Sequence, residues 1–523
     1  MSTQHYNLST GLDVKIDPSH VENEVGLAGT AVPLGSTDPK RFMETYRSYA
    51  PEFARNTERR LVRKIDSRLM PFVVITYLFN YLDRMSITQA RLYGLQEDTH
   101  VKGAMYQTAI SIFAAGYIFM QLPSTLMMSK FQPHIFLPGV IVIWAIVSGC
   151  TAATSSAAGL LTVRFFLGLV EAPFFPGAVY YLSCWYTKKE LGVRMALLVC
   201  GLLLSNSFAG LISAGILYGM AGVGNLAAWR WLFILEGLAT AVVGVTGYFV
   251  IPDYPGTTKW LSEEEKVVAQ GRLATDAGNE DGTGEDEVTI WQGIAWALKD
   301  SRVWLFACLQ MATVASISYS HFFPTLIQQI GFKNNTTVLL LTTPPYLFSF
   351  LWAMGFAFDA DRRQKRSPHA IISGAVAMAA TACLIALGEQ KWARYALTFF
   401  VCAGTFGIFS TTYTWLSSTI VQPRVKRAAA IGIANTCANV ASLFANYFWL
   451  DRYEPYFRES WACLLAFQAL GMACILTLRY MMKRRNKHFE ILTVQISQSD
   501  AAAMGRLTEE EQRAVANGYR YII

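Results

Sequence analysis

Long apolar runs, separated by short blocks that hold nearly all of the charge, are the feature that most restricts the fold of this chain. Twelve such runs can be counted in its 523 residues, each close to the roughly 20 residues that a helix needs to cross a bilayer. Inside hydrocarbon, every backbone N–H and C=O group of such a run must be satisfied within the segment, as a helix does. Only 15% of the residues are charged, against about 25% in an average soluble protein. The chain is therefore predicted to be an all-α membrane protein with 12 transmembrane helices.

The predicted spans fall into two groups of six, which indicates two six-helix bundles. The N-terminal bundle is expected at 69–251 and the C-terminal bundle at 303–482, with a linker at 252–302 between them. Polar tails are expected at 1–68 and 483–523. A solute path between two such bundles, near the bilayer midplane, is the usual geometry of a secondary transporter. The individual spans are expected near 69–90, 105–128, 134–154, 159–182, 194–221, 230–251, 303–328, 336–358, 369–388, 394–417, 427–450 and 460–482.

Basic residues gather in alternate connections between the spans, and this pattern predicts the orientation of the chain. One set of connections carries most of them, whereas the turn at 154–158 has no charge. By the positive-inside rule, both termini and the linker are expected to be cytoplasmic. Residues 1–68 contain no apolar segment of the signal-peptide type, so the first span is expected to serve as the targeting signal. Within the linker, Ser262 followed by Glu265 fits a helix capping box.

Several classes of function are disfavoured by what the sequence lacks. The nine cysteines have no metal-ligand spacing, and we find no nucleophile–base pair and no phosphate-binding loop. An enzyme is therefore not expected, and neither is a metal or an organic cofactor. The basic residues lie at the ends of spans, so no nucleic-acid partner is predicted. The expected surroundings are the lipid bilayer, and the chain is expected to be a monomer.

The first span, 69–90, contains charges that are expensive in hydrocarbon. Asp83 and Arg84 are adjacent there, two residues after Tyr81. Each charge costs roughly 2.5–3.5 kcal/mol at the centre of a span. Such a cost usually indicates a substrate or ion path. The alternative is that Asp83 simply neutralises Arg84 at the outer interface, where a long side chain can reach the headgroups.

Other residues of the spans suggest close packing or bends. Pro173 and Pro176 in the fourth span, and the pair Pro344-Pro345 in the eighth, suggest kinked or broken helices. The glycines of the fifth span are expected to allow close helix packing. Glu236 in the sixth span is expected to hold helices together.

Seven sequence blocks carry a likeness to a known group of proteins. They are LDRMSITQARLYGL (82–95), YQTAISIFAAGYIFMQLPS (106–124), RFFLGLVEAPFFPGAVYYLSCWYTKKELGVR (164–194), WRWLFILEG (229–237), LLLTTPPYLF (339–348), DADR (359–362) and PRVKRAAAIGIANTCAN (423–439). With these blocks the chain resembles the major facilitator superfamily over residues 69–480. More narrowly, it resembles the anion:cation symporter family and its fungal allantoate-permease-like branch. Many relatives have Asn where this chain has Ser86.

The resemblance implies the major facilitator fold and roles for matching residues. It implies that Asp83 and Glu171 couple transport to protons, that Arg84 holds the substrate anion, and that Tyr81 lies in the pocket. Arg164 and Glu171 are seven residues apart and therefore share one helix face. Arg164 is therefore expected to take part in proton coupling together with Asp83 and Glu171.

Further site residues are predicted in the second half of the chain. Asn435 and Asn439, one helical turn apart, and His321, in a span interior, are candidates for substrate binding. Contacts between helices would explain Asn435 and Asn439 equally well, and a helix contact is the more usual role of a lone polar residue such as His321. The loop after the eighth span keeps three charged residues that are expected to act in gating rather than in substrate contact: Asp359, Asp361 and Arg362.

These features predict a proton-coupled symporter that takes up a small organic anion, such as a carboxylic vitamin, a ureide or a sugar acid, across the plasma membrane. The proton is the coupling ion. Proton-driven efflux of a metabolite or drug is the alternative, although the fifth span lacks the GPxxGG-type motif typical of antiporters. A non-transporting nutrient sensor is a third possibility, but it would be expected to have longer tails. One arginine predicts an anion and leaves its size open.

Overall fold

The computed structural model describes residues 45–46, 48–128, 131–278, 290–363, 365–420, 424–496 and 521. Within these residues the regular elements are helices, with no strand. The first half contains α3 (Pro51–Arg91), α4 (Leu95–Asp98), α5 (Met105–Met128), α6 (Pro133–Cys150), α7 (Ala157–Glu171), α8 (Phe174–Ser183), α9 (Lys188–Gly219) and α10 (Ala228–Val250). The linker contains α11 (Glu263–Gly278) and α12 (Ile290–Lys299). The second half contains α13 (Ser301–Ile317), α14 (Phe323–Gln329), α15 (Asn335–Arg363), α16 (Ser367–Ala386), α17 (Lys391–Thr419), α18 (Arg424–Phe444) and α19 (Arg458–Ile496).

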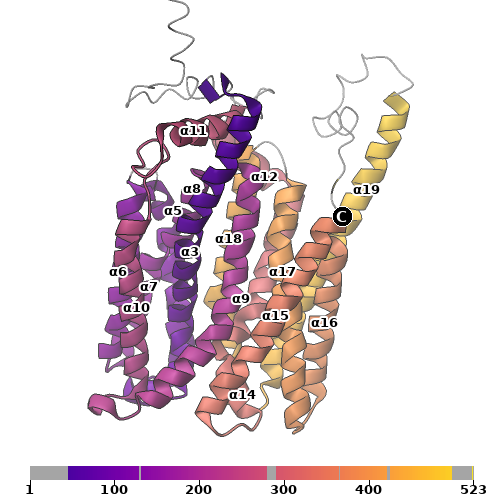
Figure 1. Ribbon diagram of the computed structural model, residues 1–523. Helices are drawn as coiled ribbons and strands as arrows, with labels where there is room; N and C mark the ends of the chain where they lie inside the picture. Colours follow the sequence, from indigo (N-terminus) through magenta and orange to yellow (C-terminus); the bar gives the residue numbers. More distant parts are fainter. Residues whose placement is uncertain are drawn as a thin grey trace, which may run out of the picture.

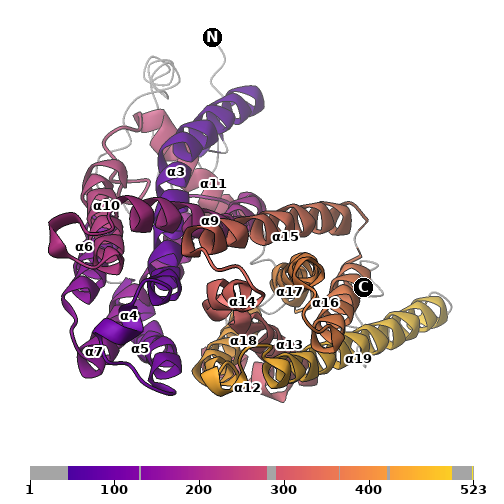
Figure 2. The same ribbon diagram turned by 90° about the horizontal axis from the view of Figure 1, so that it is seen from below.

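The long helices run side by side through one bundle (Figure 1). Ten stretches of the described chain are long and apolar enough to cross a membrane. Helices α3 and α5 are not among these ten stretches, but they run beside them through the same bundle (Figure 1). Seen along the bundle, α3 to α10 gather on one side and α13 to α19 on the other (Figure 2). The predicted all-α membrane fold, with 12 transmembrane helices in two six-helix bundles, is confirmed.

The helices at the ends of the chain are longer than the predicted spans. Helix α3 begins at Pro51 rather than near residue 69, and α19 continues to Ile496 rather than ending near 482. The early part of α3 buries Leu61 and Ile65 and packs against α11, so it is stabilised outside the membrane-spanning part. We call the end of the bundle where α11 and α12 lie the linker end; the start of α3 and the end of α19 also project there (Figure 1).

Two of the predicted spans are broken near their middle. The fourth span is divided into α7 and α8 at Ala172 and Pro173, as its prolines suggested. The seventh span is divided by a 3₁₀ helix, Ser318–Phe322, which separates α13 from α14. Pro344 and Pro345, by contrast, lie inside α15 without interrupting it. Irregular backbone at membrane depth is tolerated where it is buried in protein or lines a cavity.

The two halves contact each other mainly away from the linker end. Helix α9 packs against α15, and α5 packs against α18. At Gly210 on α9 a Cβ would lie 2.3 Å from Thr342 Oγ1 and 2.6 Å from the backbone oxygen of Leu339. Such distances show that α9 and α15 touch backbone to backbone, as glycine permits.

Hydrogen bonds between the halves close the same end. Asn335 Nδ2 donates to Leu92 O (2.7 Å), and Gln107 Nε2 donates to Trp449 O (2.6 Å). An ion pair joins Arg91 to Asp451, with 2.8 Å between Nη2 and Oδ1. The bundle is therefore fastened at the end opposite the linker.

Candidate functional site

The charged residues of α3 meet those of α7 in the interior of the first half. Arg84 Nε lies 2.7 Å from Glu171 Oε2, and the Glu171 side chain is fully buried. Asn80, one turn earlier on α3, donates its Nδ2 to the same oxygen at 2.9 Å. The break after Glu171 places this carboxyl at the C-terminal end of α7. Glu171 is thus held by two donors from one face of α3.

Aromatic rings surround the guanidinium group of Arg84. Its central carbon lies 5.0 Å from the ring centre of Tyr81, 5.1 Å from that of Phe113 and 4.9 Å from that of Tyr117. A cation is attracted to the faces of such rings, by about 2 kcal/mol or more where water is excluded. The Arg84 side chain keeps 18% of its surface accessible. It is therefore a stabilised charge that a small ligand can still reach.

Asp83 does not pair with Arg84, so the alternative of an interface pair formed by these neighbours does not hold. The Asp83 side chain is buried, and its Oδ2 accepts a hydrogen bond from Trp144 Nε1 of α6. Adjacent residues of a helix point in different directions, because one turn takes 3.6 residues. Asp83 and Arg84 therefore turn toward different neighbouring helices.

A second buried carboxyl group, here bonded to a hydroxyl group, is contacted by α3 about one turn further along the helix. Ser86 Oγ donates to Glu236 Oε2 of α10, and both side chains are buried. The serine that replaces the asparagine of many relatives thus has a specific partner. This contact also places Glu236, which the sequence suggested only as a helix-joining residue, beside the predicted site.

Arg164 of α7 is buried without a hydrogen-bond partner for its Nε and Nη2 atoms among the described residues. The carboxylates whose charges act on it are Glu171, Asp83 and Glu236. The first half therefore gathers three buried carboxyl groups, one buried guanidinium group and the partly accessible guanidinium group of Arg84 in one cluster. We call it the charge cluster: Asp83, Arg84, Arg164, Glu171 and Glu236. With every group ionised, the three carboxylates outnumber the two guanidinium groups, and the charge cluster has a net charge of one negative unit.

The candidates from the second half approach this cluster to different degrees. His321 lies in the 3₁₀ helix between α13 and α14, and the charges acting on it are those of Arg164 and Arg84. Asn435 Oδ1 accepts a hydrogen bond from Tyr413 OH at 3.1 Å. Asn439 Nδ2 donates to Gln121 Oε1 of the first half at 3.2 Å. His321 thus lies within electrostatic reach of two arginines of the charge cluster.

Tyr413, the partner of Asn435, extends the site toward Arg84. The phenol groups of Tyr81 and Tyr117 act electrostatically on it, and these are two of the rings around Arg84. Trp144, Asn80, Phe113, Tyr117 and Tyr413 were not among the predicted site residues. The aromatic ones looked like ordinary span residues, because sequence spacing does not show which rings from separate helices meet.

The predicted gating residues lie where α15 ends. Asp359 Oδ1 accepts from Arg363 Nε at 2.8 Å, and its Oδ2 lies 2.8 Å from His369 Nε2 on α16. The Arg362 side chain is exposed. The side chain of Asp361 lies outside the described part of the chain. Asp359 therefore joins the ends of α15 and α16 and does not contact the charge cluster.

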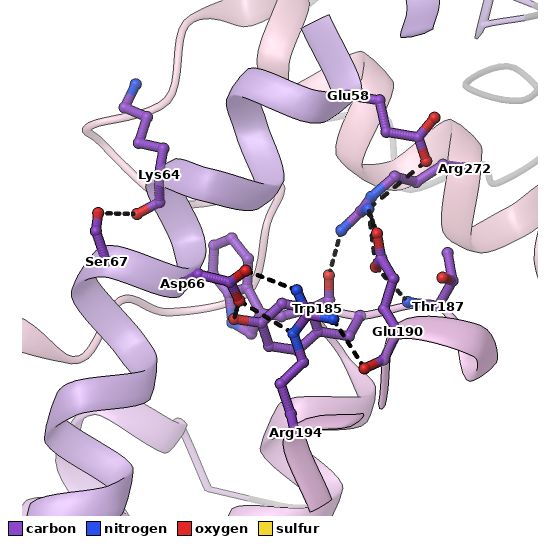
Figure 3. A network of polar contacts seen from close by, with 10 residues as sticks. Glu58, Lys64, Asp66, Ser67, Trp185, Thr187, Glu190, Arg194 and Arg272 are labelled. Atoms are coloured by element: carbon purple, nitrogen blue, oxygen red, sulfur yellow. Dashed lines mark hydrogen bonds and ion pairs between the residues drawn. The ribbon is translucent and has the colours of Figure 1, made fainter. Parts of the chain in front are cut away.

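A network of polar contacts fixes α11 to the first half at the linker end (Figure 3). Arg272 Nη1 lies 2.9 Å from Glu190 Oε1, and its Nη2 donates to Trp185 O at 2.6 Å. Beside it, Arg194 Nη2 lies 2.6 Å from Asp66 Oδ2. We call this network, together with the ion pair between Lys64 and Glu265, the linker clamp. It joins α3, α9 and α11 outside the spans.

The pair that completes the linker clamp joins α3 to the start of α11. Lys64 Nζ lies 2.7 Å from Glu265 Oε2. Burial raises the pKa of Glu265, but the hydrogen bonds from Lys64 and Ser262 outweigh it and hold that pKa below its usual value. The predicted capping box is confirmed, because Ser262 N donates to Glu265 Oε2 (3.0 Å) and Glu265 N donates to Ser262 Oγ (3.2 Å).

Comparison with known proteins gives consistent matches over most of the chain. The family model of the Major Facilitator Superfamily matches residues 73–446. An uncharacterized transporter of Schizosaccharomyces pombe is 31% identical over 396 residues, which are 76% of this chain and 78% of that protein. The metabolite transport protein NicT of Pseudomonas putida is 31% identical over 393 residues, covering 74% of this chain and 86% of NicT. The crystal structure of a D-xylose–proton symporter superposes with a TM-score of 0.59 at 12% identity, covering 79% of this chain and 96% of that one.

Proposed function

Because this chain belongs to the Major Facilitator Superfamily, we propose that it is a proton-coupled symporter that takes up a small organic anion. The superfamily makes it a multi-pass integral membrane transporter and not an enzyme. Coupling to protons and an anionic substrate are our proposals, and so are the plasma membrane as its location and the cytoplasmic position of both termini. The observation that carries the proposal is the charge cluster.

The composition of the charge cluster favours proton binding. Three buried carboxyl groups face two guanidinium groups. A buried charge without a partner costs several kcal/mol. Neutrality within the cluster is reached when one carboxyl group carries a proton. We assign proton coupling to Asp83 and Glu171, with Arg164 as the charge that stabilises their ionised forms.

The ion pair between Arg84 and Glu171 links protonation to substrate binding. A substrate carboxylate can take a two-pronged grip on a guanidinium group. Glu171 already occupies Arg84 at 2.7 Å, so an entering anion competes with it. Removing the partner of a buried ion leaves a cost of about 3–5 kcal/mol, which proton uptake by Glu171 relieves. Anion binding at Arg84 therefore favours a proton on Glu171.

The remaining site residues are proposed to set the shape of the pocket. The ring of Tyr81 contacts the Arg84 guanidinium group, where it can also lie against a planar part of the substrate. His321, Asn435 and Asn439 are proposed to supply polar contacts from the second half. Asp359, Asp361 and Arg362 are proposed to act in gating at the linker end.

Uptake of labelled organic anions into transporter-deficient cells tests the proposal. A screen of carboxylic vitamins, ureides and sugar acids, with and without a protonophore, identifies the substrate class. Import that collapses with the protonophore supports symport. Loss of preloaded substrate driven by an inward proton gradient would instead indicate efflux, and no flux with any solute would favour a sensor.

Glu171→Gln is the decisive variant for coupling. We expect uptake by this variant to lose its dependence on external pH, because the amide cannot exchange a proton. Exchange of labelled for unlabelled substrate, which needs no net proton movement, should persist. Glu263→Gln is the matched control, since Glu263 is exposed on α11 far from the charge cluster. A Glu171→Gln protein with the pH profile of the unsubstituted chain would refute the coupling role.

A further inference from the structure

Helix α12 is too short to be a span and has an unusual surface. Its ten residues, IWQGIAWALK, hold one ionisable side chain, that of Lys299. A span needs about 20 residues. Even so, Trp291 is 79% exposed and Trp296 is 43% exposed. Two exposed tryptophans on ten residues require an explanation.

Three of the exposed apolar residues form a stripe on the side of α12 that faces away from the protein. Trp291, Ala295 and Leu298 are four and three residues apart, so they share one face of the helix, and all three are exposed. Gly293 and Ala297 form the opposite, buried face. A Cβ at Gly293 would lie 2.3 Å from Val425 Cγ1 of α18. The contact with α18 therefore fixes which face of α12 points outward.

The other linker helix shows the reverse arrangement. Helix α11 exposes the carboxyl groups of Glu263 and Glu264 and buries Val267, Val268 and Ala269. That is the pattern of a helix packed on protein with its polar side in water. The two helices of the linker thus differ in what they expose: α11 exposes charged side chains, whereas α12 exposes apolar side chains that are unfavourable in water.

Helix α12 continues directly into a membrane span. It ends at Lys299, and the span that contains α13 begins at Ser301. Trp304 on α13 is 49% exposed, and its Nε1 donates to Leu298 O at 2.8 Å. The exposed surfaces of α12 and of the start of this span are therefore continuous. Tryptophan is enriched where membrane and water meet.

From this continuity we propose that α12 is an interfacial helix, with Trp291, Ala295 and Leu298 inserted at the boundary between the lipid headgroups and the acyl chains. Its partner is the lipid leaflet at the linker end. The helix anchors the second end of the linker in the bilayer, whereas the linker clamp holds the first end on protein. The ion pair of Lys426 with Asp300, at 2.7 Å, ties this anchor to the start of α18.

Photo-crosslinking in liposomes tests the proposal. The photoreactive residue p-benzoylphenylalanine is placed at position 291, 298 or, as a water-facing control, 263. The protein is reconstituted in phosphatidylcholine with phosphatidylglycerol that contains radiolabelled lipid. We expect lipid adducts at 291 and 298 at least fivefold above those at 263. Yields equal to those at 263, or adducts to another polypeptide in their place, would overturn the proposal.

Hydroxyl-radical footprinting of the unsubstituted chain in the same liposomes does not depend on folding of a variant. Phe53, which is 42% exposed near the start of α3, is the water-facing reference. After correction for intrinsic reactivity, Trp291 should be oxidised several-fold less than Phe53, although Trp291 is the more exposed side chain. Oxidation of Trp291 at or above the level of Phe53 contradicts insertion in lipid.

Discussion

Adding one methyl group at Gly210 should weaken the closed end of the transporter. The Cβ of Gly210→Ala would lie 2.3 Å from Thr342 Oγ1 and 2.6 Å from Leu339 O. The hydroxyl can turn away, but the backbone oxygen can move only with α15. Overpacking of this kind costs about 1–3 kcal/mol. The cost falls on the state in which α9 and α15 touch, so the population of that state should fall by roughly 5- to 150-fold relative to one in which they separate.

Gly215→Ala on the same helix is the matched control, because its Cβ meets nothing within 4 Å. Both substitutions gain about 1 kcal/mol of helix propensity, so this contribution cancels in the comparison. Hydrogen–deuterium exchange should rise in 85–95 and 335–345 for Gly210→Ala only. The double variant Gly210→Ala/Thr342→Ala should regain part of the protection from exchange, because the clash with Thr342 Oγ1 is removed. The recovery should be incomplete, because the clash with Leu339 O remains. Equal exchange in the two alanine variants would refute the reasoning.

Other substitutions test the contacts outside and beside the spans. Burial raises the pKa of Asp300, but its bonds to Arg302 and Lys426 outweigh this effect and hold the pKa well below its usual range. The Asp300 carboxylate therefore contributes its full stabilisation above about pH 4, its usual pKa. This stabilisation is lost as the pH falls below that value. Asp300→Asn should lower the free energy of unfolding at pH 7 by about 3–5 kcal/mol, with a smaller difference from the unsubstituted protein at pH 3, as measured by denaturant unfolding in detergent. Ser86→Ala should cost about 1–3 kcal/mol by leaving Glu236 without its hydroxyl donor, whereas Ser86→Thr should retain most of the stability; equal losses would contradict the contact. Arg272→Ala should increase hydrogen–deuterium exchange in α11 and leave α12 unchanged.

The sequence predicted the order of the helices well, because the length of apolar runs is set by the thickness of the bilayer. It also predicted that the fourth span would break, since Pro173 removes a backbone donor next to a buried acid. The same reasoning was less useful for Pro344 and Pro345, which α15 accommodates. Within 252–302 the sequence indicates a linker with one capping box and does not reveal α12, because ten apolar residues are too few to indicate a span.

The partners within the site could not be read from the sequence. Asp83 and Arg84 are neighbours in the chain, yet the turn of the helix directs one to Trp144 and the other to Glu171. Ser86 and Glu236 are 150 residues apart, and no local pattern joins them. Charges in a span indicate that a site exists, but packing of the helices decides which charges meet.

Helix α3 has a mechanical consequence, because it is one continuous helix of 41 residues, about 60 Å long at 1.5 Å per residue. The linker clamp holds it at Lys64 and Asp66, the charge cluster lies at Asp83 and Arg84, and the closing contact with the second half is made by Arg91. A rod of this kind acts as a lever. A tilt of five degrees about the cluster moves the clamped region, about 28 Å away along the axis, by some 2–3 Å. Under the proposed proton coupling, a change in the protonation of the cluster would be transmitted to both ends of α3 as displacement rather than as charge.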